Sequence, residues 1–118
     1  SFKKMQQDKE AWGNLIKSSI GGHILNSALG TKIEVFYWKE GSNEVDFVIR
    51  RGSEIIAIEV KTAREPGKEH LKGLRAIEQL KNLKRRILVY PGKHDRLTDD
   101  RIEIMGLETF LSALKDGF

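Results

Sequence analysis

Apolar residues recur at helical spacing in the first part of the chain and then give way to short, dense apolar runs separated by turn residues. Between residues 10 and 29 the apolar side chains lie mostly three or four positions apart, which predicts an amphipathic helix that Gly30 ends. Residues 1–9 are polar, and we expect them to be a frayed lead-in or the remnant of a linker, so that one domain spans residues 10–118. The predicted buried stripe of the helix consists of Trp12, Leu15, Ile16, Ile20, Ile24 and Ala28.

Runs rich in β-branched and aromatic residues follow, and they predict strands. Residues 32–39 form the first strand, and residues 44–50 and 55–61 form two more on either side of a turn that contains Gly52. The short turn predicts that the last two strands pair as a hairpin. Residues 55–58 are apolar at every position, which is typical of a strand buried on both faces.

A second helix, two strands and a third helix complete the pattern. Residues 69–83 have helical periodicity, residues 86–90 form a buried strand parallel to the preceding one, and residues 107–114 form a last short helix. Residues 101–105 alternate as in a short edge strand, and the polar residues 93–100 before them are expected to be a surface loop rather than a metal site. This order of elements predicts an α/β fold, with a central mixed β-sheet flanked by helices.

Composition narrows the class of protein. With 118 residues the chain is expected to be one domain, and no phosphate-binding loop of the G-x-x-x-x-G-K-[ST] kind occurs in it. The absence of cysteine and of a long apolar run predicts a soluble, cytoplasmic protein without a membrane segment. A net charge of +4 is compatible with nucleic-acid binding but does not require it.

Charged residues at the end of the strand 55–61 are the first candidate for chemistry. Glu59 and Lys61 lie on the same face of that strand because side chains two positions apart point the same way. The hairpin is expected to bring Asp46 of the partner strand near them. Two carboxylates can hold Mg²⁺ or Mn²⁺ while a lysine orients or deprotonates the attacking water. The alternative is a solvated strand end with a Glu/Lys pair.

Asp46, followed after a short hairpin by Glu59-Val60-Lys61, resembles the core signature of the PD-(D/E)XK nuclease superfamily. More narrowly, the chain resembles the DUF4143 family, a C-terminal domain found behind a P-loop ATPase module in many bacterial and archaeal proteins. The similarity runs from about residue 8 to residue 114, and four blocks carry it: residues 12–15 with 25–26, residues 34–38, residues 44–48 and residues 58–61.

The resemblance implies a restriction-endonuclease-like fold and a metal-dependent phosphodiesterase. Asp46 and Glu59 would then bind Mg²⁺ or Mn²⁺ together with the Val60 carbonyl, and Lys61 would position the water. It also implies that the chain is the C-terminal piece of a longer protein, whose upstream P-loop ATPase module would be its partner.

Lys17 departs from the family pattern. The first helix of related families usually contributes a glutamate to the metal site, and Lys17 stands at that position here. An ammonium does not ligate a cation, so the site would be impaired. The alternative function is a catalytically inactive module that binds nucleic acid or holds partner domains together, with Lys17 paired to Asp46 and Glu59. A third interpretation is that the alignment is off by a turn, or that another carboxylate, such as Glu10 or Glu69, supplies the missing acid.

Two further expectations concern the helices. Gly13, Lys17 and Gly21 are four residues apart, so we expect this face of the first helix to lie tight against the sheet. The second helix and its exit are basic, and the candidate phosphate contacts there are Lys68, Lys72 and Arg75. A solvated helix face diluted by acidic residues is the alternative.

Overall fold

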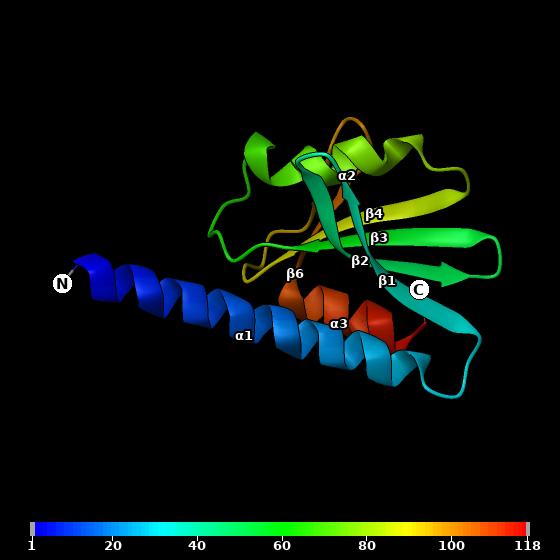
Figure 1. The fold of residues 1–118 in the computed structure, drawn as a ribbon, viewed down its shortest axis with the longest axis horizontal. Coiled ribbons are helices and arrows are strands. Elements are labelled where there is room, and N and C mark those ends of the chain that lie inside the picture. Colours follow the sequence, from blue (N-terminus) through cyan, green and yellow to red (C-terminus); the bar gives the residue numbers. More distant parts are fainter. Residues whose placement is uncertain (1, 118) are drawn as a thin grey trace.

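A single mixed sheet with helices on both faces makes up the part of the chain that the computed structural model describes, residues 2–117, with only the backbone described for residues 2–9 (Figure 1). This confirms the predicted α/β class. Three helices (α) and two 3₁₀ helices (η) accompany six strands, and the order is α1 (Phe2–Ala28), β1 (Ile33–Glu40), β2 (Asn43–Arg51), β3 (Glu54–Val60), η1 (Lys68–Leu71), α2 (Lys72–Ala76), η2 (Ile77–Gln79), β4 (Leu83–Tyr90), β5 (Arg96–Leu97), β6 (Glu103–Gly106) and α3 (Leu107–Lys115).

The sheet has an antiparallel half and a mainly parallel half. Its strand order is β1-β2-β3-β4-β6-β5; β1, β2 and β3 pair antiparallel, whereas β3, β4 and β6 are parallel. The predicted hairpin is therefore confirmed, and Gly52 in its turn has a φ of +63°. Because β3, β4 and β6 are parallel, their C-terminal ends all lie on the same side of the sheet, which is the edge formed by strand ends and not by an outer strand. The prediction that residues 101–105 form an edge strand was wrong, because β5, in the segment expected to be a loop, pairs outside β6.

Helices cover the two faces unequally. α1 and α3 lie on one face and α2 with its flanking 3₁₀ turns on the other, as Figure 1 shows. β3 is buried between the layers, as its sequence predicted: Ile56, Ile58 and Val60 face α1 and α3, and Ala57 faces α2.

α1 differs from its prediction in length and in the face that it buries. It begins at Phe2, so the backbone is helical where a frayed lead-in was expected, and Figure 1 shows its first turns extending beyond the sheet. Ile20 and Ile24 are buried as predicted, but Trp12 and Leu15 are 58% and 61% exposed. The predicted stripe was too wide, because a straight helix on a sheet buries only one side of its surface.

The second helical segment is shorter than the predicted residues 69–83. It runs from η1 through α2 to η2 and ends at Gln79. Asn82 then adopts a φ of 66°, a conformation that asparagine tolerates better than most residues, and Leu83 already pairs with Ile55. The apolar residues at the end of the predicted helix therefore belong to the turn and to β4, which begins three residues before the predicted position 86.

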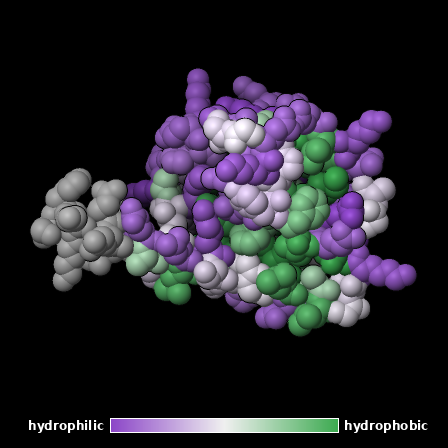
Figure 2. All heavy atoms as spheres, viewed as in Figure 1, coloured by the Kyte–Doolittle hydropathy of each residue, from purple (hydrophilic) through white to green (hydrophobic). Residues whose placement is uncertain are grey.

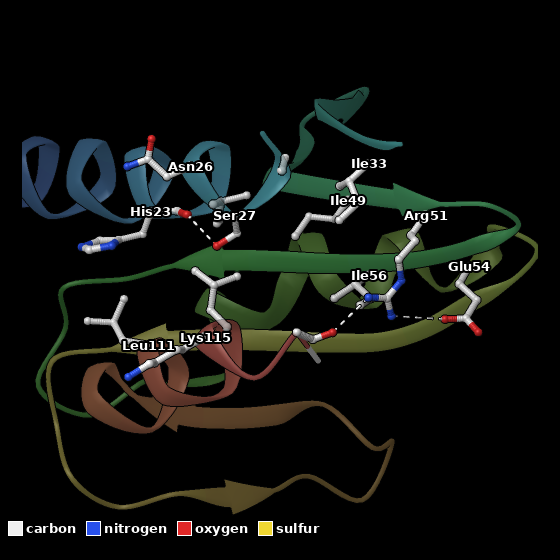
Figure 3. Close-up of a pocket in the computed structure, with 14 residues that line it drawn as sticks. His23, Asn26, Ser27, Ile33, Ile49, Arg51, Glu54, Ile56, Leu111 and Lys115 are labelled. Carbon is white, nitrogen blue, oxygen red and sulfur yellow. Dashed lines mark hydrogen bonds and ion pairs between the residues drawn. The ribbon is translucent and has the colours of Figure 1, made fainter. Parts of the chain in front are cut away.

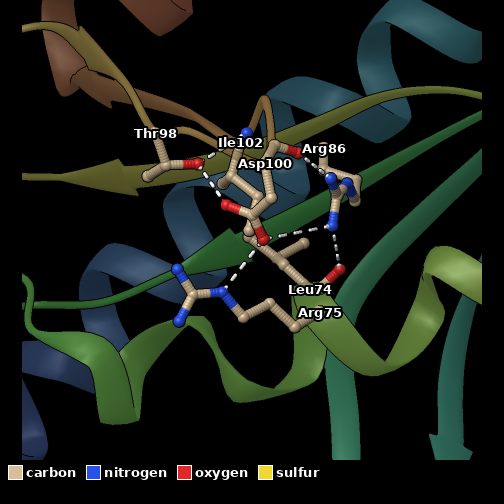
Figure 4. A network of polar contacts seen from close by, with 6 residues as sticks. All are labelled: Leu74, Arg75, Arg86, Thr98, Asp100 and Ile102. Carbon is tan, nitrogen blue, oxygen red and sulfur yellow. Dashed lines mark hydrogen bonds and ion pairs between the residues drawn. The ribbon is translucent and has the colours of Figure 1, made fainter.

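A polar network fixes the loop before β6 to α2 (Figure 4). The buried Arg86 guanidinium donates to the Leu74 carbonyl at 3.1 Å and to the Asp100 carbonyl. Arg75 Nε and the Thr98 hydroxyl donate to the Asp100 carboxylate at 3.0 and 2.6 Å. These two hydrogen bonds, from Thr98 and Arg75, lower the pKa of Asp100 to about 2. The loop is thus held by ion pairs and hydrogen bonds at one of its ends.

Candidate functional site

An irregularity in β2 positions the first acidic residue of the predicted site. Opposite Tyr37 of β1, β2 contributes two residues, Asp46 and Phe47, where a regular ladder would have one. Such a β-bulge turns the local backbone and re-aims the side chains beside it. On its other side, the ladder of β2 with β3 ends at Phe47, so Asp46 lies just beyond the last paired residue.

Two hydrogen bonds join Asp46 of β2 to Glu59 and Val60 of β3 at the end of the hairpin away from its turn. The Asp46 backbone N–H donates to Glu59 Oε1 at 3.2 Å, and the Val60 backbone N–H donates to Asp46 Oδ2 at 2.9 Å. The two carboxyl side chains thus accept hydrogen bonds from backbone N–H groups that have no partner in the β-ladder at this point. A further hydrogen bond links the two carboxyl groups. The predicted proximity of the two acids is present.

Lys17 reaches this pair from α1. Its ammonium lies 3.2 Å from Asp46 Oδ1, and its side chain is 43% exposed against 14% for Asp46. Close packing of the helix makes this reach possible: a Cβ on Gly21 would lie 3.1 Å from the Phe47 ring, and one on Gly13 would lie 3.5 Å from the hydroxyl of Thr62. The predicted tight contact of this helix face with the sheet is confirmed.

The two carboxyl groups differ in protonation. Burial and the hydrogen bond to Asp46 raise the pKa of Glu59 to about 9, so this residue keeps its proton at neutral pH. Burial also acts to raise the pKa of Asp46, but hydrogen bonds from Glu59 and Val60 together with the charge of Lys17 outweigh it, and the pKa is lowered. The site therefore holds one carboxylate, one neutral acid and one ammonium.

This arrangement does not fit a divalent cation as it stands. Both oxygens of Asp46 are occupied, one by the Lys17 ammonium and one by the Val60 N–H, and Glu59 is neutral. Mg²⁺ and Mn²⁺ prefer several anionic oxygens, which these residues do not offer while Lys17 is present. Among the described residues, no group of three or more acidic, histidine or cysteine side chains is placed to hold a metal, so neither Glu10 nor Glu69 completes a three-acid site with the pair.

Gly73 of α2 packs against the other side of the acid pair. A Cβ there would clash with the Glu44 carbonyl and lie 3.2 Å from Glu59 Oε2. Gly73 was not among the residues that the sequence predicted for the site. A glycine inside a helical segment was the available signal, because it costs about 1 kcal/mol relative to alanine and is retained where backbones approach closely.

A polar hollow of about 490 Å³ opens beside the acid pair. Lys17 and Lys61 line it, and the Lys61 backbone N–H donates to the Val89 carbonyl at 2.9 Å. The two lysines outnumber the one carboxylate of the lining, that of Glu10, so the hollow suits an anion better than a cation. The lining residues are Glu10, Gly13, Asn14, Lys17, Val60, Lys61 and Thr62.

The three basic residues predicted to contact phosphates are spread along the second helical segment. Lys68 is exposed at the start of η1, next to the loop that follows β3. Lys72 Nζ donates to the Ser42 hydroxyl at 3.1 Å, and Arg75 is paired with Asp100. The structure therefore leaves Lys68 exposed and directs Arg75 into the network before β6.

The fold and site define a class: a small α/β domain with an acid pair at the end of a β-hairpin and a lysine beside it. A family model described as "Domain of unknown function (DUF4143)" matches residues 12–110. The chain therefore belongs to the DUF4143 family. A search of curated proteins found no match. In the described part of the chain, no helix is long and apolar enough to cross a membrane.

Proposed function

We propose that this chain is a restriction-endonuclease-like module that has exchanged its metal for an internal ammonium and binds nucleic acid without cleaving it. The observation that carries the proposal is the Lys17 ammonium 3.2 Å from Asp46 Oδ1. The largely buried Asp46 carboxylate would be costly without a counter-charge, and the lysine supplies the positive charge that a bound metal would otherwise provide.

The sheet edge beside the site is basic, which supports a polyanionic ligand. Lys61, Arg64 and Lys68 follow β3, while Lys93 and Arg96 follow β4, the parallel neighbour of β3. Arg96 donates to the Pro66 carbonyl at 3.0 Å, so the two loops are in contact. In α/β sheets, ligands bind beyond the carboxyl ends of parallel strands.

The acidic residues of these loops offset this charge only in part. Glu65 and Glu69 remain exposed, but Asp95 is engaged by the backbone N–H of Gly106 and the Thr109 hydroxyl, each at 2.8 Å. A phosphate in the hollow would lie among residues that include Lys17 and Lys61. The resemblance further suggests that an upstream P-loop ATPase module is the partner to which this domain would connect the nucleic acid.

A second candidate function is a metal-dependent phosphodiesterase, favoured by the hydrogen-bonded Asp46 and Glu59. In that case a divalent ion would displace Lys17, Asp46 and Glu59 with the Val60 carbonyl would hold Mg²⁺ or Mn²⁺, and Lys61 would orient water.

Calorimetric titration with Mn²⁺ separates the two candidates. We expect no binding by the unaltered chain and binding by Lys17→Glu, because the substitution replaces the ammonium by a third carboxylate. Adding Asp46→Ala to the Lys17→Glu variant should abolish this Mn²⁺ binding. Binding by the unaltered chain that Asp46→Ala abolishes would favour the phosphodiesterase, and nuclease assays on DNA and RNA would follow.

Fluorescence anisotropy with labelled single- and double-stranded DNA and RNA tests the binding function. Lys61→Ala should weaken binding several-fold near 0.1 M salt, and the slope of log K against log [salt] should become shallower by about 0.7 to 0.9 for each lost phosphate contact. Lys81→Ala is the matched control, because this exposed lysine lies at the opposite edge of the sheet, before β4. Equal losses in both variants, or no binding, would contradict a specific site.

A further inference from the structure

The face of α1 turned away from the sheet exposes large apolar side chains. Leu15, Leu25 and Leu29 are 61%, 56% and 75% exposed, and Trp12 is 58% exposed. Figure 2 shows apolar side chains gathered in the lower part of the view, where α1 and α3 lie in Figure 1. Between residues 11 and 29 Lys17 is the sole Lys, Arg, Asp or Glu, and it points to Asp46 on the sheet. A solvent-facing helix side without charge is unusual for a surface that stays in water.

The spacing on this face matches a second copy of itself. Its central residues are separated alternately by four and three positions, as in the seam of a helix pair: Ala11, Leu15, Ser18, Gly22, Leu25 and Leu29. An antiparallel pair centred near Ile20 sets Leu15 of one copy opposite Leu25 of the other, and Ser18 opposite Gly22. The position of a Cβ on Gly22 meets open space, so two backbones can approach closely there.

A pocket at the C-terminal end of α1 supplies an independent observation. It encloses about 600 Å³ between α1, the β2–β3 hairpin and α3, with an apolar floor that includes Ile49, Ile56 and Leu111. Figure 3 shows His23 and Ser27 of α1 along one side of it. Arg51, Glu54 and Lys115 also line the pocket, but most of its lining surface is apolar, and a pocket of this size and character suits an aromatic side chain.

The antiparallel pairing brings an aromatic side chain, that of Trp12 of the second copy, toward this pocket. In such a pair, a two-fold axis runs perpendicular to both helices. A given side of one helix therefore lies next to the same side of the other helix. Trp12 and His23 lie on one flank, about 20° apart around the helix axis at about 100° per residue. In the pairing centred near Ile20, the second copy's Trp12 comes level with Ala28, one of the residues that line the pocket.

We infer that α1 is the interface of an antiparallel homodimer in which the Trp12 indole of each copy enters the pocket of the other. The occupant is a second copy because the uncharged seam is symmetric about its own centre, and because the same helix carries both the exposed indole and one wall of the pocket that receives it. This inference does not rest on the proposed function, since the seam faces away from the Lys17–Asp46 pair.

Sedimentation equilibrium of the 118-residue chain measures its oligomeric state directly. We expect a mass twice the 13.5 kDa of one chain at micromolar concentration. Leu25→Glu should weaken the dimer at least tenfold. The matched control is Leu97→Glu, because Leu97 is 58% exposed on β5, away from α1, and this variant should remain dimeric. A monomer at about 100 μM of unaltered chain, or a dimer unaffected by Leu25→Glu, would overturn the inference.

A charge exchange tests the register. Leu15→Lys and Leu25→Glu should each dissociate the dimer, whereas the double variant should restore it, because each lysine then faces a glutamate of the other copy. The double variant Leu15→Lys with Leu25→Lys should stay monomeric. Trp12→Ala should weaken association without changing the circular dichroism of the monomer. Failure of the oppositely charged double variant to recover, with both single variants folded, would refute the antiparallel pairing.

Discussion

At the scale of residues, the site is governed by the unequal protonation of two neighbouring acids. Glu59 is 4% exposed and hydrogen-bonds a carboxylate, so its neutral form is favoured, whereas Asp46 has an ammonium and a backbone N–H beside it. Such coupled acids titrate as a pair that shares one proton over a wide pH range. Lys17 decides which member of the pair carries the negative charge.

Replacing Glu59 tests this assignment through the pH dependence of stability. The folded chain keeps the Glu59 proton up to pH about 9, while the unfolded chain releases it near the ordinary value of 4.5. Between these values the folded state binds more protons, so the free energy of unfolding falls as pH rises, by at most about 1.4 kcal/mol per unit. Glu59→Gln imitates the neutral acid and should flatten this decline.

Urea unfolding of both chains at pH 5, 6, 7 and 8 makes the measurement. The variant should match the unaltered chain at low pH and exceed it at high pH. Parallel curves would show that Glu59 is ionised in the folded protein. The lowered pKa of Asp46 acts in the opposite sense, and its contribution is lost only as pH falls below the ordinary value of 3.8.

At the scale of elements, arginine side chains connect α2 to the chain that follows β5. Arg86 and Arg75 both contact Asp100, but Arg86 is buried and also donates to two backbone carbonyls, while the Arg75 side chain is 41% exposed (Figure 4). The buried Arg86 guanidinium supplies hydrogen-bond donors to the Leu74 carbonyl of α2 and to the Asp100 carbonyl of the loop. Its contribution to stability should therefore be the larger.

Arg86→Met and Arg75→Met form a matched pair of variants for this comparison. Arg86→Met leaves the Leu74 and Asp100 carbonyls without that donor and should lower the free energy of unfolding by about 2 to 4 kcal/mol. Arg75→Met removes an exposed ion pair and should cost less than about 1 kcal/mol. Denaturant unfolding at one pH measures both. Equal effects would mean that the buried arginine is not a structural link.

At the scale of the whole molecule, the sheet brings distant segments of the chain to one edge. The loops after β3 and β4 meet there, and α1 places Lys17 against the hairpin from the N-terminal part of the chain. The first turns of α1 extend past the sheet in Figure 1, so the fold itself depends on α1 mainly from Ile16 onward.

Deletion of residues 1–9 tests this division. The remaining chain keeps Ile16, Ile20 and Ile24 on the sheet, so its free energy of unfolding should change by less than about 1 kcal/mol. Thermal and urea unfolding at equal protein concentration measure the difference. A larger loss would place part of the core in the first turns of α1 and would contradict a domain that begins near residue 10.

Features that depend on local periodicity could be predicted from the sequence. The continuous apolar run at 55–58 predicted a strand buried on both faces, and the short turn at Gly52 predicted the hairpin that brings Asp46 to Glu59. These predictions succeeded because side-chain direction and turn geometry are set by neighbouring residues. The helix 69–83 failed for the opposite reason: its last apolar residues are recruited by pairing with β3.

Features of the site and of the surface could not be predicted in this way, because they depend on long-range packing. The bulge at Asp46, the ion pair to Lys17, the retained proton of Glu59 and the contact with Gly73 depend on burial and on segments far apart in sequence. The exposed seam of α1 is of the same kind, because an apolar pattern shows that a helix has an apolar face but not which side the sheet covers. Long-range packing and desolvation fix these features, and local propensity does not contain them.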